Sequence, residues 1–248
     1  MTKLVVTRPE GQADGLIQSL QALGHQVVHC PLMKIEPLNQ SASGIPPLLK
    51  HRILNIDEYD AVISISANAS DCGLELMDEF WPQFPIGIDW YAVGPASAKE
   101  LQQAGMKVRL PVAQFDSEGL LALPSLKSVA GKKILIWRGV GGRETLAQVL
   151  QERGAHVDYA ELYERQQQSY PKENWVQILA GEPWLVLSSG QALDIVQQQV
   201  TDLGARIQGL ILPSQRVAQG LDDQQFPRIL VPASARDVDV LGLIEQEL

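Results

Sequence analysis

The sequence predicts an α/β protein with two parallel β-sheets that carry helices on both faces. Short apolar runs alternate with segments of helical periodicity along the whole chain. Two looser segments, at about 36–57 and 166–172, interrupt this alternation. In addition, residues 4–35 resemble residues 134–165 without a gap, at an offset of 130 positions. Such a repeat indicates an internal duplication, so each predicted domain is expected to contain one copy.

The second copy shows the repeated unit most clearly. Residues 134–137 are apolar and bounded by charge, which predicts a buried strand. A glycine-rich turn at 139–142 follows, and residues 143–153 then carry apolar side chains at helical spacing. Gly154 is placed to end this helix, and a second strand leads to Tyr163. The matched pairs of the two copies are Arg8 and Arg138, Gly11 and Gly141, Leu16 and Leu146, Leu20 and Leu150, Gly24 and Gly154, Val27 and Val157, and Leu32 and Leu162.

The rest of the chain continues the same alternation. Further short strands are expected at residues 60–65, 90–93, 108–110, 184–187, 210–212 and 229–231. A polar or proline-containing turn and then a helix follow most of them. The looser segments divide the chain into a middle domain, residues 37–169, and a discontinuous outer domain, residues 1–36 plus 170–248.

Composition and charge exclude several classes of function. The chain has 248 residues, 45% hydrophobic and 20% charged, with a net charge of −9. An acidic chain argues against nucleic-acid or membrane-surface binding, both of which need a basic footprint. Cys30 and Cys72 are isolated and are expected to be reduced thiols. The start of the chain shows no basic and apolar leader, and no apolar span of about 18 residues occurs, so we expect a cytoplasmic protein.

The glycine-rich turn is not a nucleotide-binding motif. A dinucleotide fingerprint needs a third glycine where Glu144 stands, and the Lys-Ser/Thr of a P-loop is missing. The histidines show no convincing metal spacing. No cofactor and no metal are therefore expected.

Small polar residues follow several of the predicted strands. In parallel sheets ligands bind beyond the carboxyl ends of the strands, where helix N-termini favour anions. The alternative is that these residues simply cap helices, as Ser and Asn often do. For any single residue the helix cap is the favoured interpretation, whereas their repetition at most strand ends indicates that some of them face a shared anionic ligand. The candidates are Ser64, Ser66, Asn68, Ser97, Ser188, Ser189, Gly190 and Ser214.

Three larger side chains complete the set of candidates. Arg8 and Arg138 lie at equivalent strand ends and could bind carboxylates in a bidentate manner, or could form structural ion pairs. Tyr163 lies at the exit of the second copy, where Met33 stands in the first. From physical chemistry alone, the favoured interpretation of Tyr163 is a half-buried strand tyrosine with a satisfied hydroxyl.

Motifs along nearly the whole chain resemble those of the uroporphyrinogen-III synthase family. They are VTRPEGQADGL, SISANA, AVGPASAKEL, the segment from Ile134 to Arg165, LVLSSGQAL and LPSQRVAQ. The resemblance implies two flavodoxin-like domains joined by a two-stranded linker, with the first and last segments sharing one domain. This agrees with the two looser segments.

The resemblance also implies a reaction. Family members take hydroxymethylbilane, a linear tetrapyrrole with eight carboxylates, and close it with loss of water and inversion of the last pyrrole. No cofactor is used, and the substrate is expected in a cleft between the domains. Tyr163 matches the family tyrosine implicated in assisting loss of the hydroxyl. The strand-end residues, together with Gly139, Gly142 and Arg143, would bind the carboxylates.

The chain departs from the family pattern at a few positions. Ile65 replaces a frequent threonine, whereas Ser97 and the pair Ser188-Ser189 keep a hydroxyl at theirs. The pattern around Ser214 varies too much to give that residue a role.

Two classes of function suit these features. The first is a cofactor-free synthase that acts as a monomer and makes a transient contact with the preceding pathway enzyme. The second is a non-enzymatic, two-lobed sensor of a small anionic ligand. Tyr163 beside the glycine-rich turn favours the enzyme, because a sensor would not need that residue there.

Overall fold

The computed structural model describes residues 1–41, 44–112, 114–221 and 225–248. The chain divides into two compact units. Unit 1 comprises Met1–Lys34 and Gln166–Leu248, and unit 2 comprises Ile35–Arg165. Within the described residues, no helix is both long enough and apolar enough to cross a membrane.

Unit 1 contains a five-stranded parallel sheet in the order β2-β1-β9-β10-β11. Numbered along this unit, the order is 2-1-3-4-5, which is that of flavodoxin-like folds. The strands are β1 (Lys3–Val6), β2 (Gln26–His29), β9 (Trp184–Val186), β10 (Gly209–Ile211) and β11 (Ile229–Leu230). The helices are α1 (Asp14–Ala22), α8 (Lys172–Ile178), α9 (Gly190–Gln199), the 3-10 helix η3 (Leu203–Arg206), α10 (Gln215–Ala218) and α11 (Asp237–Glu247).

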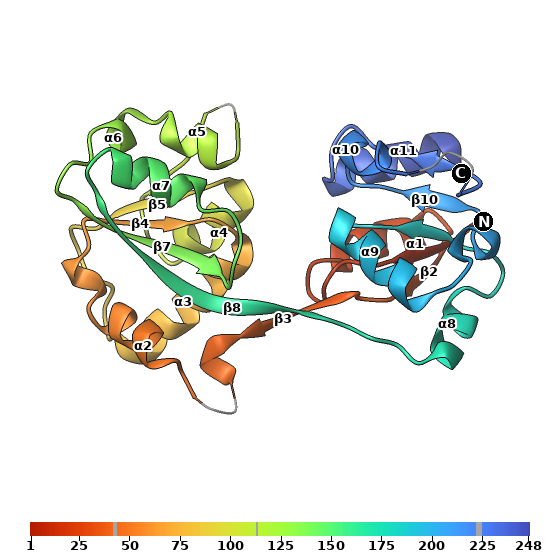
Figure 1. Cartoon of the computed structure of the whole chain (residues 1–248), viewed down its shortest axis with the longest axis horizontal. Coiled ribbons are helices and arrows are strands. Elements are labelled where there is room, and N and C mark those ends of the chain that lie inside the picture. The colour runs from red at the N-terminus through yellow and green to blue at the C-terminus, as the bar shows by residue number, and fades with distance from the viewer. Residues whose placement is uncertain (42–43, 113, 222–224) are drawn as a thin grey trace. The chain divides into compact units, whose positions relative to one another are not determined.

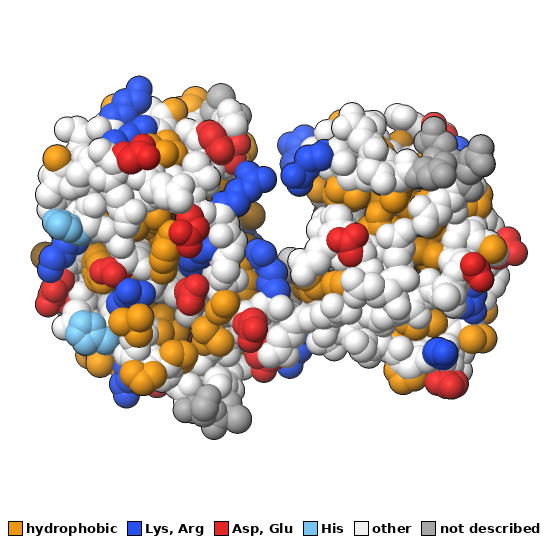
Figure 2. All heavy atoms as spheres, viewed as in Figure 1, with side chains coloured by type: hydrophobic (Ala, Val, Ile, Leu, Met, Phe, Trp, Pro, Cys, Tyr) orange, Lys and Arg blue, Asp and Glu red, His pale blue; other side chains and the backbone are white. Residues whose placement is uncertain are grey.

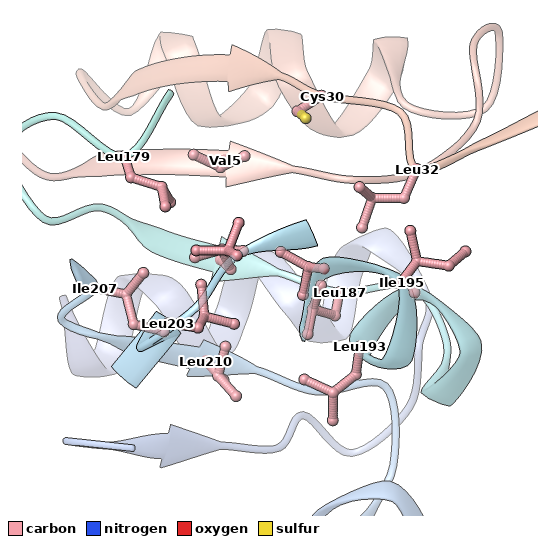
Figure 3. Close-up of a cluster of buried hydrophobic side chains, with 14 of the residues drawn as sticks. Val5, Cys30, Leu32, Leu179, Leu187, Leu193, Ile195, Leu203, Ile207 and Leu210 are labelled. Atoms are coloured by element: carbon pink, nitrogen blue, oxygen red, sulfur yellow. The ribbon is translucent and has the colours of Figure 1, made fainter. Parts of the chain in front are cut away.

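Alternate strand residues of unit 1 enter two cores. Leu4 and Val6 pack with α1 and α11, whereas Val5 packs with α8 and α9. Figure 3 shows Val5 and Leu210 in one cluster with Leu193 and Ile195 of α9. Each strand therefore buries both faces, and helices cover both sides of the sheet.

Unit 2 repeats this architecture in a different chain order. Its sheet has the order β3-β8-β7-β4-β5-β6, and every pairing from β8 to β6 is parallel. The strands are β3 (Met33–Pro37), β4 (Ala61–Ser64), β5 (Asp89–Ala92), β6 (Val108–Arg109), β7 (Lys133–Gly139) and β8 (His156–Gln167). The helices are η1 (Leu38–Gln40), α2 (Pro47–Leu54), η2 (Ile56–Glu58), α3 (Ala67–Phe80), α4 (Pro95–Gln103), α5 (Ser117–Leu121), α6 (Pro124–Lys127) and α7 (Thr145–Glu152). Helices α2 and α3 lie on one side of the sheet and α5 and α7 on the other (Figure 1).

If β7 is counted as the first strand, unit 2 also has the flavodoxin-like order. The strand order β8-β7-β4-β5-β6 then becomes 2-1-3-4-5. Strands β7 and β8 of unit 2 therefore correspond to β1 and β2 of unit 1. These are the two copies found in the sequence. The flavodoxin-like α/β prediction is confirmed.

The duplication extends to register and to backbone conformation. Lys3 pairs with Gln26 in the first copy, and Lys133 pairs with His156 in the second, again at an offset of 130. Gly11 and Gly141 have φ of 73° and 72°, and Gly24 and Gly154 have 84° and 86°. Left-handed conformations of this kind favour glycine, which explains why these positions match.

Strands β3 and β8 are hydrogen-bonded neighbours, and both run from one unit into the other. In the first copy the strand is interrupted at Pro31, between the end of β2 and the start of β3. In the second copy β8 is continuous across the equivalent position, Glu161. Proline lacks the N–H that a strand ladder needs. Residues 36–57 were expected to be loose, but they contain η1 and α2 and the beginning of η2.

Candidate active site

The candidate active site lies at the carboxyl ends of β4 and β7 in unit 2. The strand order reverses between these two strands, and such a switch point is where open α/β sheets bind ligands. A pocket of about 430 Å³ opens there. It brings together six of the predicted site residues: Ser66, Arg138, Gly139, Gly142, Arg143 and Tyr163.

A β-bulge places Tyr163 in this pocket. Arg138 pairs with Glu161, but the next residue, Gly139, pairs with Tyr163, so Leu162 is the extra residue in β8. The Tyr163 ring then lies directly on Gly139, because a Cβ at that glycine would be 2.7 Å from two ring carbons. Gly139 is therefore needed for close approach of the ring.

The hydroxyl of Tyr163 has two polar neighbours. Its oxygen lies 3.0 Å from Ser66 Oγ, and it accepts a hydrogen bond from Arg165 Nη2 at 3.3 Å. The Arg165 guanidinium also lies 5.8 Å from the centre of the Tyr163 ring. Tyr163 as a whole is 1% exposed, more buried than the half-buried strand tyrosine considered from the sequence. The hydroxyl is satisfied, as that interpretation expected.

Arg138 is a buried cation that lines the pocket. It is 3% exposed, and its guanidinium lies 4.5 Å from the centre of the Tyr159 ring. Nε donates to the carbonyl of Gly139 at 3.2 Å. No carboxylate of the described residues forms an ion pair with it. A buried cation whose neighbours are a ring and a carbonyl is well suited to bind a ligand anion.

Arg143 and Arg165 are exposed and also line the pocket. Together with Arg138 they concentrate positive charge in a chain whose net charge is −9. Over the face of unit 2 seen in Figure 2, basic and acidic side chains are otherwise interspersed. The positive charge is thus local, as expected for a small anionic ligand rather than a nucleic acid.

The serines after β4 and β5 differ in what they can reach. Ser66 caps α3 by accepting from the N–H of Ala69 at 3.1 Å, and it also lines the pocket. Ser64 is fully buried, with Oγ 2.7 Å from Ser70 Oγ. Ser70 donates in turn to the carbonyl of Ser97, whose own side chain is buried. The hydrogen bonds of Ser64 and Ser97 to Ser70 therefore lie beneath the surface. Their burial disfavours direct contact between Ser64 or Ser97 and a ligand.

The remaining predicted residue of unit 2 is Asn68, which lies half-buried in the first turn of α3. It is next to the cap at Ser66 but does not line the pocket. Its assignment to substrate binding stays a prediction.

The candidates in unit 1 surround the equivalent switch point, between β1 and β9. Arg8 forms an ion pair with Asp237 and donates to the carbonyl of Ala235. The ion-pair alternative for Arg8 is the one that the structure shows.

The predicted serines of unit 1 differ in their surroundings. Ser189 caps α9 by accepting from the N–H of Ala192. Arg8 and Ser188 line a small cavity with a volume of about 30 Å³. Ser189 and Gly190 line a separate, open pocket with a volume of about 640 Å³. Ser214 precedes α10, and its side chain does not cap that helix.

Several pocket residues were not predicted from the sequence. Phe115, Asp116 and Ser117 precede or begin α5, and Tyr159 and Arg165 lie on β8. Asp116 caps α5 by accepting from the N–H of Gly119, a contact that lowers the pKa of its carboxyl group. Burial raises the pKa of Tyr159, and the charge of Glu144 adds to this effect. The alternation of β8 could have identified Arg165, because residues i and i+2 of a strand share a face and Tyr163 was already a candidate.

Among the described residues, no group of three or more His, Cys, Asp or Glu side chains is placed to hold a metal ion. The polar groups of the pocket are hydroxyls, arginines and one carboxylate. They suit binding of an anion and transfer of a proton.

Comparison with known proteins identifies the family. Residues 14–241 match the family model described as uroporphyrinogen-III synthase HemD. The uroporphyrinogen-III synthase of Escherichia coli K12 is 35% identical over 166 residues, which span 65% of this chain and 64% of that protein. The match thus covers slightly less than two thirds of the E. coli protein. The enzyme of the same name from Synechococcus elongatus is 30% identical, over 98% of this chain and 94% of that protein.

Solved structures show the same fold. A mutant uroporphyrinogen III synthase from Thermus thermophilus aligns with a TM-score of 0.63 at 15% identity, over 99% of this chain and 98% of that one. The synthetase from Helicobacter pylori 26695 aligns with a TM-score of 0.62 at 16% identity, over 99% of both chains. The family model spans nearly the whole chain, and the chain therefore belongs to the uroporphyrinogen-III synthase family.

Proposed function

We propose that this protein converts hydroxymethylbilane into uroporphyrinogen III, closing the ring with loss of water and inversion of the last pyrrole. The observation that carries this proposal is the pocket of unit 2, which Tyr163 and three arginines line together. Family membership supplies the reaction, and the pocket supplies groups that suit it.

The arginines suit the charge of the substrate. Hydroxymethylbilane carries eight carboxylates, and a buried guanidinium can bind a carboxylate through two parallel hydrogen bonds. The buried Arg138 would hold one carboxylate in the pocket, and the exposed Arg143 would meet another. The backbone N–H groups of Gly141 and Gly142, which line the same pocket, would add hydrogen bonds.

Tyr163 suits the loss of the hydroxyl group. A tyrosine hydroxyl is protonated at neutral pH and can donate its proton to a leaving oxygen. The Tyr163 ring packs on Gly139, and this contact would fix the position of the phenolic proton in the pocket. Because hydroxymethylbilane closes spontaneously to the uninverted isomer, most of the enzyme's task is to hold one folded geometry of the chain.

The finer predictions stay predictions. They are that the reaction takes place between the two domains, that the protein is a cytoplasmic monomer, and that it contacts the enzyme that supplies its substrate.

The test is to mix the purified protein with fresh hydroxymethylbilane, oxidise the products and separate the isomers chromatographically. A reaction without protein gives the spontaneous rate of type I formation. Predominantly type III product, formed faster than that background, would support the proposal. Type I product at the spontaneous rate would contradict it, and saturable binding of the substrate in the same sample would favour the non-enzymatic sensor instead.

A further inference from the structure

Arg165 has a specific relation to the hydroxyl of Tyr163. Both residues lie on β8 two positions apart, so their side chains share a face of the strand. Arg165 donates from Nη2 to the phenolic oxygen at 3.3 Å, and its guanidinium lies beside the ring. No carboxylate of the described residues forms an ion pair with Arg165. The side chain is exposed, yet its hydrogen bond goes to a buried tyrosine.

The hydrogen-bonding capacity of the atoms limits the possible arrangements. A guanidinium has no acceptor, so in its hydrogen bond with Tyr163 Arg165 is the donor and occupies one lone pair of the phenolic oxygen. Ser66 Oγ lies 3.0 Å away and already accepts from the N–H of Ala69. When Ser66 donates its proton to Tyr163, both lone pairs of the phenolic oxygen are filled. The phenolic proton is then free to point into the pocket.

On this geometry, and resting on the proposed function, we propose that Arg165 is a positioning residue that acts through Tyr163. It holds the phenolic oxygen in place and stabilises the phenolate that forms when the proton is transferred. The C–O bond to the leaving hydroxyl breaks with its electron pair on oxygen, and the Tyr163 proton converts that oxygen into water. The proton that ring closure releases from the attacked pyrrole carbon restores the phenol.

This role differs from carboxylate binding, which the other arginines of the pocket suit. A carboxylate ligand is held before and after the chemical step, so its loss mainly raises KM. A hydrogen bond that strengthens as the phenolate forms acts in the transition state, so its loss mainly lowers kcat. The two roles can therefore be separated by steady-state kinetics.

The experiment is a double-mutant cycle on type III formation, with Arg165→Gln, Tyr163→Phe and the double variant. We expect Arg165→Gln to lower kcat about tenfold with little change in KM, the size expected for one charge-assisted hydrogen bond. In the Tyr163→Phe background the same substitution should change kcat by less than about twofold, because the oxygen it acts on is gone. Arg165→Lys should retain more activity than Arg165→Gln, since it keeps a charged donor.

Arg143→Gln is the matched control. Arg143 is also an exposed arginine of this pocket, and the described residues show no contact between it and Tyr163. Its substitution should raise KM by a similar factor with and without the Tyr163 hydroxyl. The inference is overturned if Arg165→Gln lowers kcat equally in both backgrounds, or if it raises KM and leaves kcat unchanged. Native protein that forms no type III product would instead overturn the proposed function, and the inference with it.

Discussion

The switch points of the two units have the same topology, but their matched arginines have different partners and the cavities beside them differ in volume. In unit 1, Arg8 is held by Asp237 and by the carbonyl of Ala235, and the cavity beside it measures about 30 Å³. In unit 2, Arg138 stacks on Tyr159 in a pocket of about 430 Å³. An arginine that is matched in sequence thus has a partner from α11 in one unit, and in the other a ring and open space. A duplicated scaffold repeats the location of a site, whereas the neighbouring elements decide whether a ligand can use it.

A second difference lies in the pair of residues at the bulge. The second copy has Gly139 and Tyr163 where the first has Pro9 and Met33. The Tyr163 ring occupies the space that any side chain at position 139 would need. Tyr163 therefore requires glycine at position 139. The pair Gly139 and Tyr163 distinguishes the second copy, which carries the proposed proton donor, from the first.

The largest effect is expected for Tyr163→Phe. Removal of the hydroxyl eliminates the proposed proton donor, so kcat for type III formation should fall by at least about 100-fold. The ring remains, so the melting temperature should change little. The control is Met33→Leu at the equivalent position, a volume-conserving core change that should leave kcat unaltered. A near-native rate in Tyr163→Phe would remove this tyrosine from the mechanism.

The next largest effect is expected for Gly139→Ala. The added Cβ would be 2.7 Å from ring carbons of Tyr163, so the ring must move away from its position. Overpacking of this kind costs about 1–3 kcal/mol, and displacement of the hydroxyl should lower kcat about tenfold. Pro9→Ala is the counterpart in the first copy and should leave the rate of type III formation unchanged. An equal loss of rate in both variants would show that the proximity to Tyr163 is not the cause.

The two arginines should respond in different assays. Arg138→Gln should raise KM about tenfold, because a carboxylate of the substrate loses a charged partner. Arg8→Gln should lower stability by about 1 kcal/mol, the usual size for a partly exposed ion pair, and so lower Tm by about 2–4 °C. Steady-state kinetics and thermal unfolding separate the two outcomes. A stability loss as the main effect of Arg138→Gln would place that residue with Arg8 as a structural cation.

A smaller effect is expected for the helix-ending glycines. Gly24 and Gly154 have φ of 84° and 86°, and an alanine in that region costs about 1–2 kcal/mol. A Cβ at Gly24 meets no atom within 4 Å, whereas one at Gly154 would be 3.2 Å from Ala130 Cα. Gly154→Ala should therefore lower Tm more than Gly24→Ala does. The reverse order in thermal unfolding would contradict the structural difference between the copies.

Much of the fold could be predicted because it depends on local patterns. The apolar runs at 61–64, 89–92 and 184–186 are strands, and the glycines that match at an offset of 130 share their backbone conformation. Helix α2 was missed, since the prolines and serines of residues 37–47 conceal its beginning. Proline at the start of α2 is compatible with the helix, because the first N–H groups are unpaired in any case.

The site was harder to predict because tertiary contacts assemble it. Gly139, Tyr163 and Ser66 could be selected from the sequence, yet their mutual contacts depend on a bulge that no local pattern indicates. The segment from Phe115 to Ser117 reaches the pocket from α5 and carries no motif. Burial decided the rest. Ser64 and Ser97 have the same strand-end signal as Ser66, but their side chains lie beneath the surface.

Nuclear magnetic resonance of the labelled protein tests most directly whether the pocket of unit 2 binds the tetrapyrrole. Uroporphyrin III, the stable oxidised form of the product, would be titrated into the sample. We expect saturable shifts of the backbone amides at Gly139, Gly141 and Gly142, and of the Nε–H signal of Arg138. Saturable binding that leaves these signals unmoved, while those of Gly11 and Arg8 shift, would place the ligand at the first copy and contradict the assignment.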